Sequence, residues 1–201
     1  GLQLWLGLDG KKLKSLTVDL QLKNALARLR PELPQLDMAQ ASGRLCWVDL
    51  APGHLFQGGK FAFRLHEGPA FGPSSASLKM LPSHGKNPAR GELKMDGLAL
   101  SPLIVLSEYL PVDDEMRADL RKLQPKGSLR EFSATWSGAW PELQHYSVKG
   151  KFTNLGINAY MLSSGTQLPG FVNLSGNVDF NEKGGSLSLS SRQFKLVIPE
   201  V

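Results

Sequence analysis

Apolar and polar residues alternate along most of this chain, and the pattern is clearest near its C-terminal end. From Val172 to Phe180 every second residue is apolar or glycine, and the residues between them are Asn, Ser, Asn and Asp. A period of two is that of a β-strand with one apolar and one polar face. The polar stretch 181–185 ends in two glycines and predicts a turn. Because Leu187 and Leu189, and then Phe194, Leu196 and Ile198, alternate again, we predict a three-stranded antiparallel meander here.

The same alternation recurs upstream between turn residues. The clearest local signal is Asp9-Gly10, which lies between two alternating runs and predicts a hairpin. Apolar alternation predicts further strands around residues 2–8, 16–22, 39–49, 60–65, 75–80, 89–100, 129–137, 146–152 and 155–159. We therefore expect about ten to twelve strands of ordinary length.

The period changes to that of a helix in only one region. Ser101 is predicted to be an N-cap that is followed by Pro102 at the first helical position, and Leu103, Leu106 and Leu110 share one helical face. A second helix is predicted from Asp113-Asp114-Glu115, since acidic residues favour the positive end of the helix dipole. Two short helices within residues 102–123 cover only part of such a sheet. Its remaining apolar face must close into a barrel or sandwich, or stay open to a nonpolar partner, and the pattern alone allows both.

Composition and charge narrow the class of partner. The chain has 201 residues, a formal net charge of +5 and a pI near 9.4. Lysines and arginines are scattered rather than gathered into a stripe with aromatic residues, so we expect no nucleic-acid partner. No apolar run reaches the length of a membrane-spanning helix. The chain lacks a signal-peptide pattern and an initiator Met, and we interpret it as part of a longer protein.

No motif in the sequence carries a reaction. The four histidines have no metal-ligand spacing, Ser83-His84 lacks a nucleophile elbow, and the single cysteine, Cys46, has no partner for a disulfide. We therefore expect no enzyme, no metal and no cofactor. Trp136, Trp140 and Tyr146 are either a carbohydrate platform or aromatic residues that pack in the core and in a turn.

One resemblance covers most of the chain. Its best markers are Gly97-Leu98 before Ser101-Pro102-Leu103, the stretch 125–129, Trp136-Ser137-Gly138, and Pro169-Gly170-Phe171 leading to Leu174-Ser175-Gly176. These segments resemble the middle region of the YhdP-type AsmA-like proteins of Gram-negative bacteria, and residues 1–90 fit the preceding segment of that family less specifically.

The resemblance implies a mainly β fold in which a large antiparallel meander sheet is curled into an open groove, with the two helices inserted near 102–123. It implies a single segment, with first strands in 1–88, a strand and the helical pair in 89–125, and further strands in 126–201. It further implies a periplasmic segment of a long inner-membrane-anchored protein, which transfers phospholipids toward the outer membrane. The partners would be phospholipids, neighbouring segments of the same chain, and a membrane reached through regions outside this sequence.

A groove of this kind needs an apolar wall rather than a single site. The candidate wall residues are the apolar members of the alternating strands: Leu45, Trp47, Phe61, Phe63, Leu93, Val148, Phe152, Leu174, Val178, Phe180, Leu187, Leu189, Phe194, Leu196 and Ile198. The pattern does not separate those that would touch lipid from those that would pack under the helices. The alternative interpretation is a β-sandwich scaffold of the cell envelope, or a module that binds glycan or protein.

Overall fold

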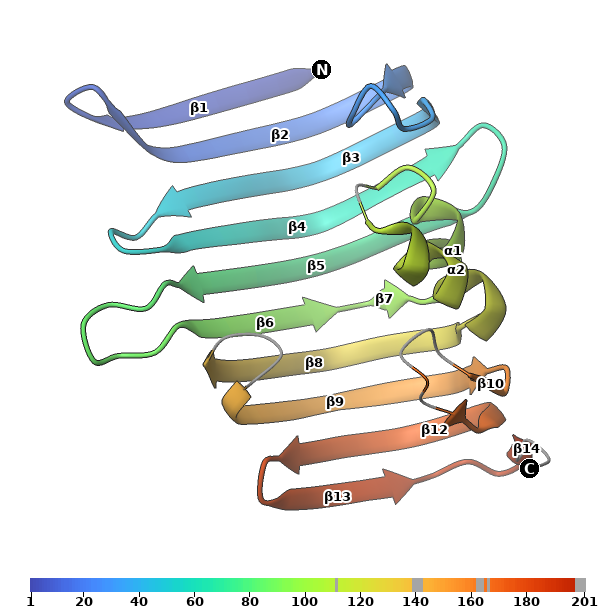
Figure 1. Cartoon of the computed structure of the whole chain (residues 1–201). Helices are drawn as coiled ribbons and strands as arrows, with labels where there is room; N and C mark the ends of the chain where they lie inside the picture. Colours follow the sequence, from blue (N-terminus) through green and yellow to red (C-terminus); the bar gives the residue numbers. More distant parts are fainter. Residues whose placement is uncertain (111, 139–142, 162–164, 166, 198–201) are drawn as a thin grey trace.

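One large antiparallel sheet makes up most of the protein, as a computed structural model of the chain shows (Figure 1). The structure describes residues 1–110, 112–138, 143–161, 165 and 167–197. The strands of the sheet follow one another in the order β1-β2-β3-β4-β5-β6-β8-β9-β12-β13. They are β1 (Leu2–Asp9), β2 (Lys12–Ala27), β3 (Leu36–Asp49), β4 (His54–Leu65), β5 (Ala70–Leu81), β6 (Arg90–Asp96), β7 (Leu98–Ala99), β8 (Lys126–Gly138), β9 (Leu143–Ile157), β12 (Gly170–Asn181), β13 (Gly184–Leu189) and β14 (Lys195–Val197). A separate small ladder joins β10 (Tyr160–Met161) to β11 (Gln167–Leu168).

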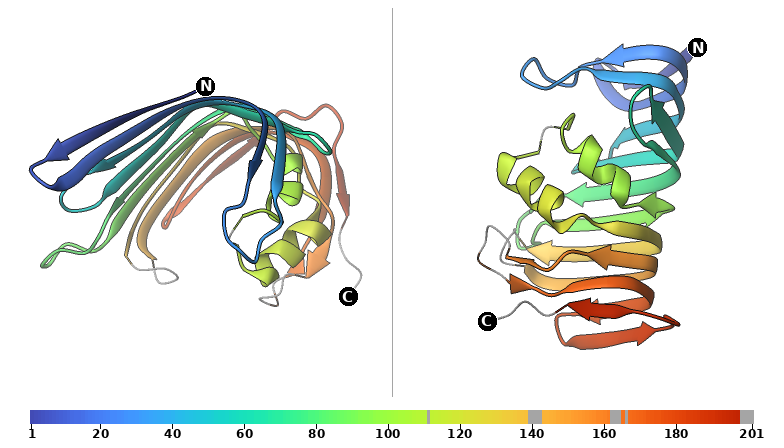
Figure 2. Two further views of the ribbon diagram at one scale, coloured as in Figure 1. Left: turned by 90° about the horizontal axis from the view of Figure 1, so that it is seen from above. Right: turned by 90° about the vertical axis from the view of Figure 1, so that its right-hand side faces the viewer.

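The sheet is curled but not closed. Its edge strands β1 and β13 lie at opposite ends of the order, and among the described residues they do not pair with each other. Seen along the sheet, the strands form an arch with a concave and a convex face (Figure 2). This confirms the mainly β fold with a large meander sheet, and of the architectures that the pattern allowed, the open sheet is the one observed rather than a barrel or a sandwich.

The C-terminal strands differ from the predicted meander. β14 does not add a third strand beyond β13, because both strands pair antiparallel with β12. β13 covers residues 176–181 of β12, and β14 covers residues 170–172. The chain therefore does not reverse after β13. Residues 190–194 interrupt one edge strand, and the prediction that the last alternating run adds a third meander strand beyond Leu187 and Leu189 is wrong.

Four residues with positive φ bend the strands. Lys60, Glu131, Asn154 and Asn173 have φ values of 49°, 48°, 51° and 61°, and the ladder shifts register beside each of them. Each shift is a β-bulge, which adds one residue to its strand and bends it. Side chains replace the lost ladder bonds at three of the bulges: the N–H groups of Lys60, Glu131 and Asn154 donate to Ser75 Oγ, Asp96 Oδ1 and Ser175 Oγ over 3.1, 3.3 and 2.9 Å.

Both predicted helices are present, and they lie on the concave side of the arch (Figure 2). They are α1 (Ser101–Leu106) and α2 (Asp114–Leu123). The predicted start of the second helix at Asp113-Asp114-Glu115 is confirmed, and the structure shows that the Asp113 side chain caps it by accepting a bond from Met116 N. Ser101 is wrong as the cap of α1, because the cap residue is Leu100 and it forms no side-chain cap bond. Neither helix, nor any other in the described part of the chain, is long and apolar enough to cross a membrane.

A small hydrophobic core joins α1 to the sheet. Its buried members are Met38, Ala41, Phe63, Leu65 and Leu106, and Leu103 and Tyr109 pack against them. Ala41 and Phe63 face each other on β3 and β4, so α1 covers the concave face at one end of these strands. The rest of that face lies outside this core.

Candidate functional site

The concave face carries an unbroken row of apolar side chains across nine strands. We call it the central row, and each member pairs in register with the next: Leu6, Leu16, Trp47, Phe56, Leu78, Leu93, Ala134, Val148 and Phe180. The row shares its face with α1, because β3 runs without a bulge from Trp47 to Ala41, which lies under that helix. Phe56 keeps 46% of its surface exposed and Phe180 keeps 39%. Such a continuous exposed apolar surface is unusual for a soluble domain and indicates a nonpolar partner.

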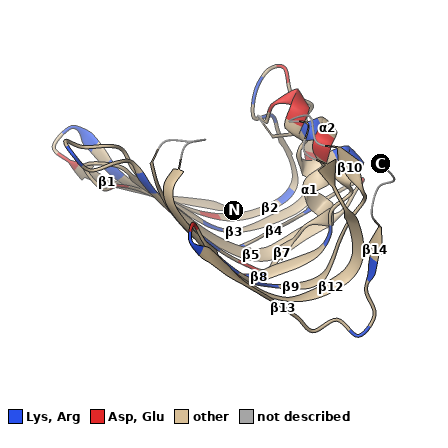
Figure 3. Cartoon of the chain, turned by 60° about the horizontal axis from the view of Figure 1, so that its bottom comes forward, with Lys and Arg blue, Asp and Glu red and all other residues tan. Residues whose placement is uncertain are grey.

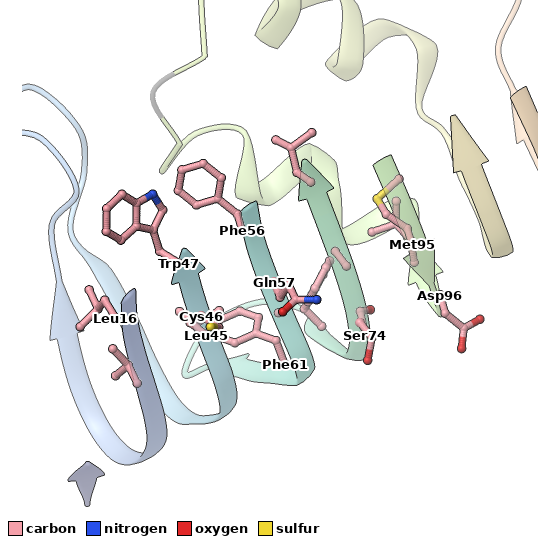
Figure 4. Close-up of a pocket in the computed structure, with 17 residues that line it drawn as sticks. Leu16, Leu45, Cys46, Trp47, Phe56, Gln57, Phe61, Ser74, Met95 and Asp96 are labelled. Atoms are coloured by element: carbon pink, nitrogen blue, oxygen red, sulfur yellow. The ribbon is translucent and has the colours of Figure 1, made fainter. Parts of the chain in front are cut away.

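A second row lies one step nearer the helices. It comprises Leu4, Val18, Leu45, Gly58, Ala76, Met95 and Phe132, again paired in register. Between them, the two rows form a groove with a volume of about 530 Å³ on strands β2 to β6. Figure 4 shows Trp47 and Phe56 side by side there, with Leu45 and Phe61 further along the same strands. The small side chains of Gly58 and Ala76 leave space between the larger ones, so the groove is hollow rather than filled by the protein.

The convex face is polar and carries cross-strand ion pairs. Arg44 donates two hydrogen bonds to its cross-strand neighbour Asp19, at 2.5 and 2.6 Å, and these bonds lower the pKa of the Asp19 carboxyl. Lys149 bonds to its neighbour Asp179 at 3.0 Å. Exposed pairs of this kind each stabilise a fold only slightly. They keep charge on the outer face, and no charged residue stands in the central or second row.

The two helices lie at one side of the groove and are joined to each other by hydrogen bonds. The side chain of Arg117 on α2 is only 14% exposed and donates to the carbonyls of Ser107, Leu110 and Val112 at 3.0, 3.3 and 3.0 Å. Arg121 donates two hydrogen bonds to the Glu108 carboxylate, and these bonds lower the pKa of that carboxyl. These bonds join α2 to the end of α1 and to the segment after it, so the two helices form one unit at the edge of the groove.

The structure places most of the candidate wall residues on the concave face. Trp47, Leu93, Val148 and Phe180 belong to the central row, Leu45 belongs to the second row, and Val178, Leu187, Leu189, Phe61, Phe152 and Leu174 pair with other members of that face. Phe63 lies in the core under α1, and Phe152 is also buried. Leu196 on β14 pairs with Phe171, and Phe194 is exposed outside any strand. Ile198 lies outside the described residues. Whether these side chains contact lipid stays a prediction.

Several groove residues were missed by sequence reasoning, of which Phe56 is the clearest case. Phe56 stands at an even position, whereas Phe61 and Phe63 stand at odd positions on the same strand. The bulge at Lys60 adds a residue between them and brings all three onto one face. The signal was present in the sequence as a change of parity at Gly58-Gly59. The bulge at Asn173 separates two residues that were expected to share a face. Its extra residue places Val172 on the face opposite to Leu174, so the prediction for Val172 is wrong.

The residues considered for other chemistry are dispersed. No group of three or more His, Cys, Asp or Glu gathers as a metal site among the described residues. Cys46 is half-buried, and Thr17 Oγ1 lies 3.4 Å from its sulfur. Trp136 pairs with Tyr146 across β8 and β9 and its ring lies over Gly91, so it packs against the sheet. Trp140 lies outside the described residues.

Comparison with known proteins gives one finding on the family. The family model described as "YhdP protein" matches residues 1–201. None of the curated proteins matches the chain, and none of the solved structures does.

Proposed function

Because the chain belongs to the YhdP family, we propose that it is one segment of a bridge through which phospholipids move across the periplasm toward the outer membrane. In this proposal the bridge is anchored in the inner membrane by regions outside this sequence, and neighbouring segments of the same protein continue the sheet. The chain performs no chemical step. It supplies a surface along which acyl chains move.

The observation that carries the proposal is the central row, which crosses nine strands of an open sheet without a charged residue. Transfer of an acyl chain into water costs a free energy of about 0.8 kcal/mol for each methylene, or roughly 10 kcal/mol for about twelve of them. An apolar row that continues from strand to strand removes most of that barrier at every step. The polar convex face keeps the outside of the sheet in water.

Site-specific photo-crosslinking tests the proposal in cells that carry radiolabelled phosphate. A photoreactive residue is placed at Leu45 or Leu187 on the concave face, and at Ser77 or Ser188 on the convex face as matched controls on the central part of the sheet and on β13. We expect lipid phosphorus to become attached to the chain from Leu45 and Leu187 only. Equal labelling from both faces, or no labelling from either, would contradict the proposal.

A further inference from the structure

The groove has two long rims that differ in construction. One rim, which we call the hairpin rim, consists of the turns at 9–12, 50–53, 82–89 and 181–184, all on the same side of the meander (Figure 1). The other, the helix rim, carries α1 and α2. Since α1 covers the concave face beside Ala41 and Phe63, the groove on β3 and β4 is bounded by the helix at that end and extends toward the hairpin rim at the other.

The two rims also differ in charge (Figure 3). Lys11, Lys12, Lys86 and Lys183 lie exposed in the hairpin rim, and within the described part of the chain no ion pair is formed by any of them. The hairpin rim contains two acids, of which Glu182 binds His145 at 3.0 Å, so that Asp9 remains. Asp49, next to the turn 50–53, binds Lys14 at 2.9 Å. The hairpin rim therefore offers lysines to an anion.

The helix rim has the opposite character. Residues 101–123 contain five acidic and three basic residues. All three basic side chains are engaged: Arg117 with Asp114, Arg121 with Glu108, and Lys122 with the Tyr160 hydroxyl. A phosphate placed beside α1 and α2 would meet this excess of negative charge.

The concave row next to the hairpin rim is amphipathic. It runs in register through Asp49, His54, Met80, Gly91, Trp136 and Tyr146, and we call it the rim row. The His54 ring stacks on Trp47 of the central row, with 5.6 Å between ring centroids. Aromatic side chains with a polar end favour the boundary between hydrocarbon and water, as they do at membrane surfaces. The rim row is thus the level at which such a boundary would lie.

The width of the groove agrees with a lipid lying along the strands. Six residues separate Trp47 in the central row from Ala41 under α1, which is about 20 Å at roughly 3.3 Å per residue. One leaflet of a bilayer holds its acyl chains in about 15 Å, half of the hydrocarbon thickness. An acyl chain therefore fits between the aromatic residues and the helix wall without leaving the apolar surface.

From these observations we infer that the lipid in the groove lies parallel to the strands, with its phosphate at the lysines of the hairpin rim and its chain ends toward α1. This rests on the proposed function and assigns the headgroup class as phosphate-bearing. Transport is then a sideways movement from strand to strand, in which each phosphate stays at the level of the rim row.

Lysine variants of the full chain test the position of the phosphate. In the rim variant Lys12, Lys86 and Lys183 are changed to Glu. In the control variant Lys23, Lys60 and Lys126, which are also exposed but lie away from the hairpin rim, are changed to Glu, so that both variants change net charge equally. The probes are dioleoyl phosphatidylglycerol and dioleoylglycerol, which has the same chains and no phosphate. Because each lysine near an anionic lipid surface contributes about 1 kcal/mol, we expect the rim variant to bind phosphatidylglycerol at least about tenfold more weakly at low salt. We expect it to bind dioleoylglycerol as the wild type does, and the control variant to bind both lipids unchanged.

Other outcomes overturn the inference in distinct ways. Equal losses in the rim and control variants would show an effect of net charge alone. A parallel loss of dioleoylglycerol by the rim variant would show that these lysines support the groove rather than the phosphate. A wild-type chain that binds neither lipid would refute the proposed function itself. The orientation has a second measurement, in which a phospholipid carries a diazirine near its carbonyl or at its terminal methyl. The first probe should label Trp47 and Tyr146 peptides and the second the Phe71 and Leu98 peptides, and the reverse pattern would contradict the orientation alone.

Discussion

Replacement of Phe56 by Asp places a charge in the middle of the central row. Phe56 pairs with Trp47 on one side and Leu78 on the other, and it keeps 46% of its surface exposed. About half of the surface of Phe56 is buried and would lose its apolar contacts. Since full burial of a Phe stabilises a fold by about 1.5–3 kcal/mol, we expect a loss of about 1 kcal/mol in the free energy of unfolding. The fold should survive.

The effect on lipid movement should be much larger. A carboxylate in the centre of a hydrocarbon layer costs about 2.5–3.5 kcal/mol, and every acyl chain that crosses β4 must pass this position in the proposed mechanism. A barrier higher by about 2.5 kcal/mol slows transfer roughly 60-fold. The matched control is Gln57→Asp, because Gln57 is the next residue of the same strand, is also exposed, and points to the convex face.

The assay measures transfer of a fluorescent phospholipid by the whole protein, together with thermal unfolding of each variant. We expect Phe56→Asp to transfer lipid at a few per cent of the wild-type rate with a small decrease in Tm, and Gln57→Asp to match the wild type in both. If Phe56→Asp is folded and transfers lipid at the wild-type rate, the acyl chains do not follow the central row. The inference that the register of the strands defines the path of the lipid would then be refuted.

Two further predictions concern the sheet itself. A Cβ at Gly91 would lie inside the ring of Trp136, so Gly91→Ala should lower the free energy of unfolding by about 1–3 kcal/mol and shift the tryptophan emission. Gly59→Ala is the control, because a Cβ at Gly59 meets nothing within 4 Å, and it should change neither property. Equal unfolding curves for the two variants would contradict this packing. The second prediction concerns pH: the bond from His145, with that from the Tyr146 N–H, lowers the pKa of Glu182 to about 2. A carboxyl group whose pKa is depressed in the folded state stabilises the fold at pH values above its unfolded pKa near 4.5, and this stabilisation is lost as the pH falls toward 2. Glu182→Gln should therefore flatten the decline of Tm between pH 4.5 and pH 2. An unchanged pH profile of Tm would count against the pair of Glu182 and His145.

The sequence predicted the architecture well where each strand keeps a single parity. The alternation follows the faces of the sheet in Leu2–Leu6, in Leu16–Leu22 and in Leu174–Phe180, and Asp9-Gly10 marks a real hairpin. Local patterns predicted both helices as well, because the acids at Asp113–Glu115 and the leucine spacing depend only on neighbouring residues.

What failed depends on contacts between residues distant in sequence. The bulge at Lys60 is stabilised by Ser75 on the next strand, and the bulge at Asn154 by Ser175. Such a partner is not recognisable until the register is known, so the face of Phe56 could not be assigned from β4 alone. The pairing of β14 could not be predicted for the same reason. Its three residues are compatible both with a new strand beyond β13 and with a continuation of the edge strand beside β12.

The openness of the sheet has a consequence for its stability. Only six hydrophobic residues of the described chain are buried, and five of them form the cluster at α1. A sheet normally buries its apolar face against a second layer, and here that layer covers one end only. In the proposed function lipid supplies the remainder. A ligand that binds only the folded state stabilises it, by about 2.7 kcal/mol at a concentration one hundred times its Kd. Bound phospholipid should then raise the Tm of the wild type, and should raise that of Phe56→Asp much less, because the same hydrocarbon contact acts in both transport and folding.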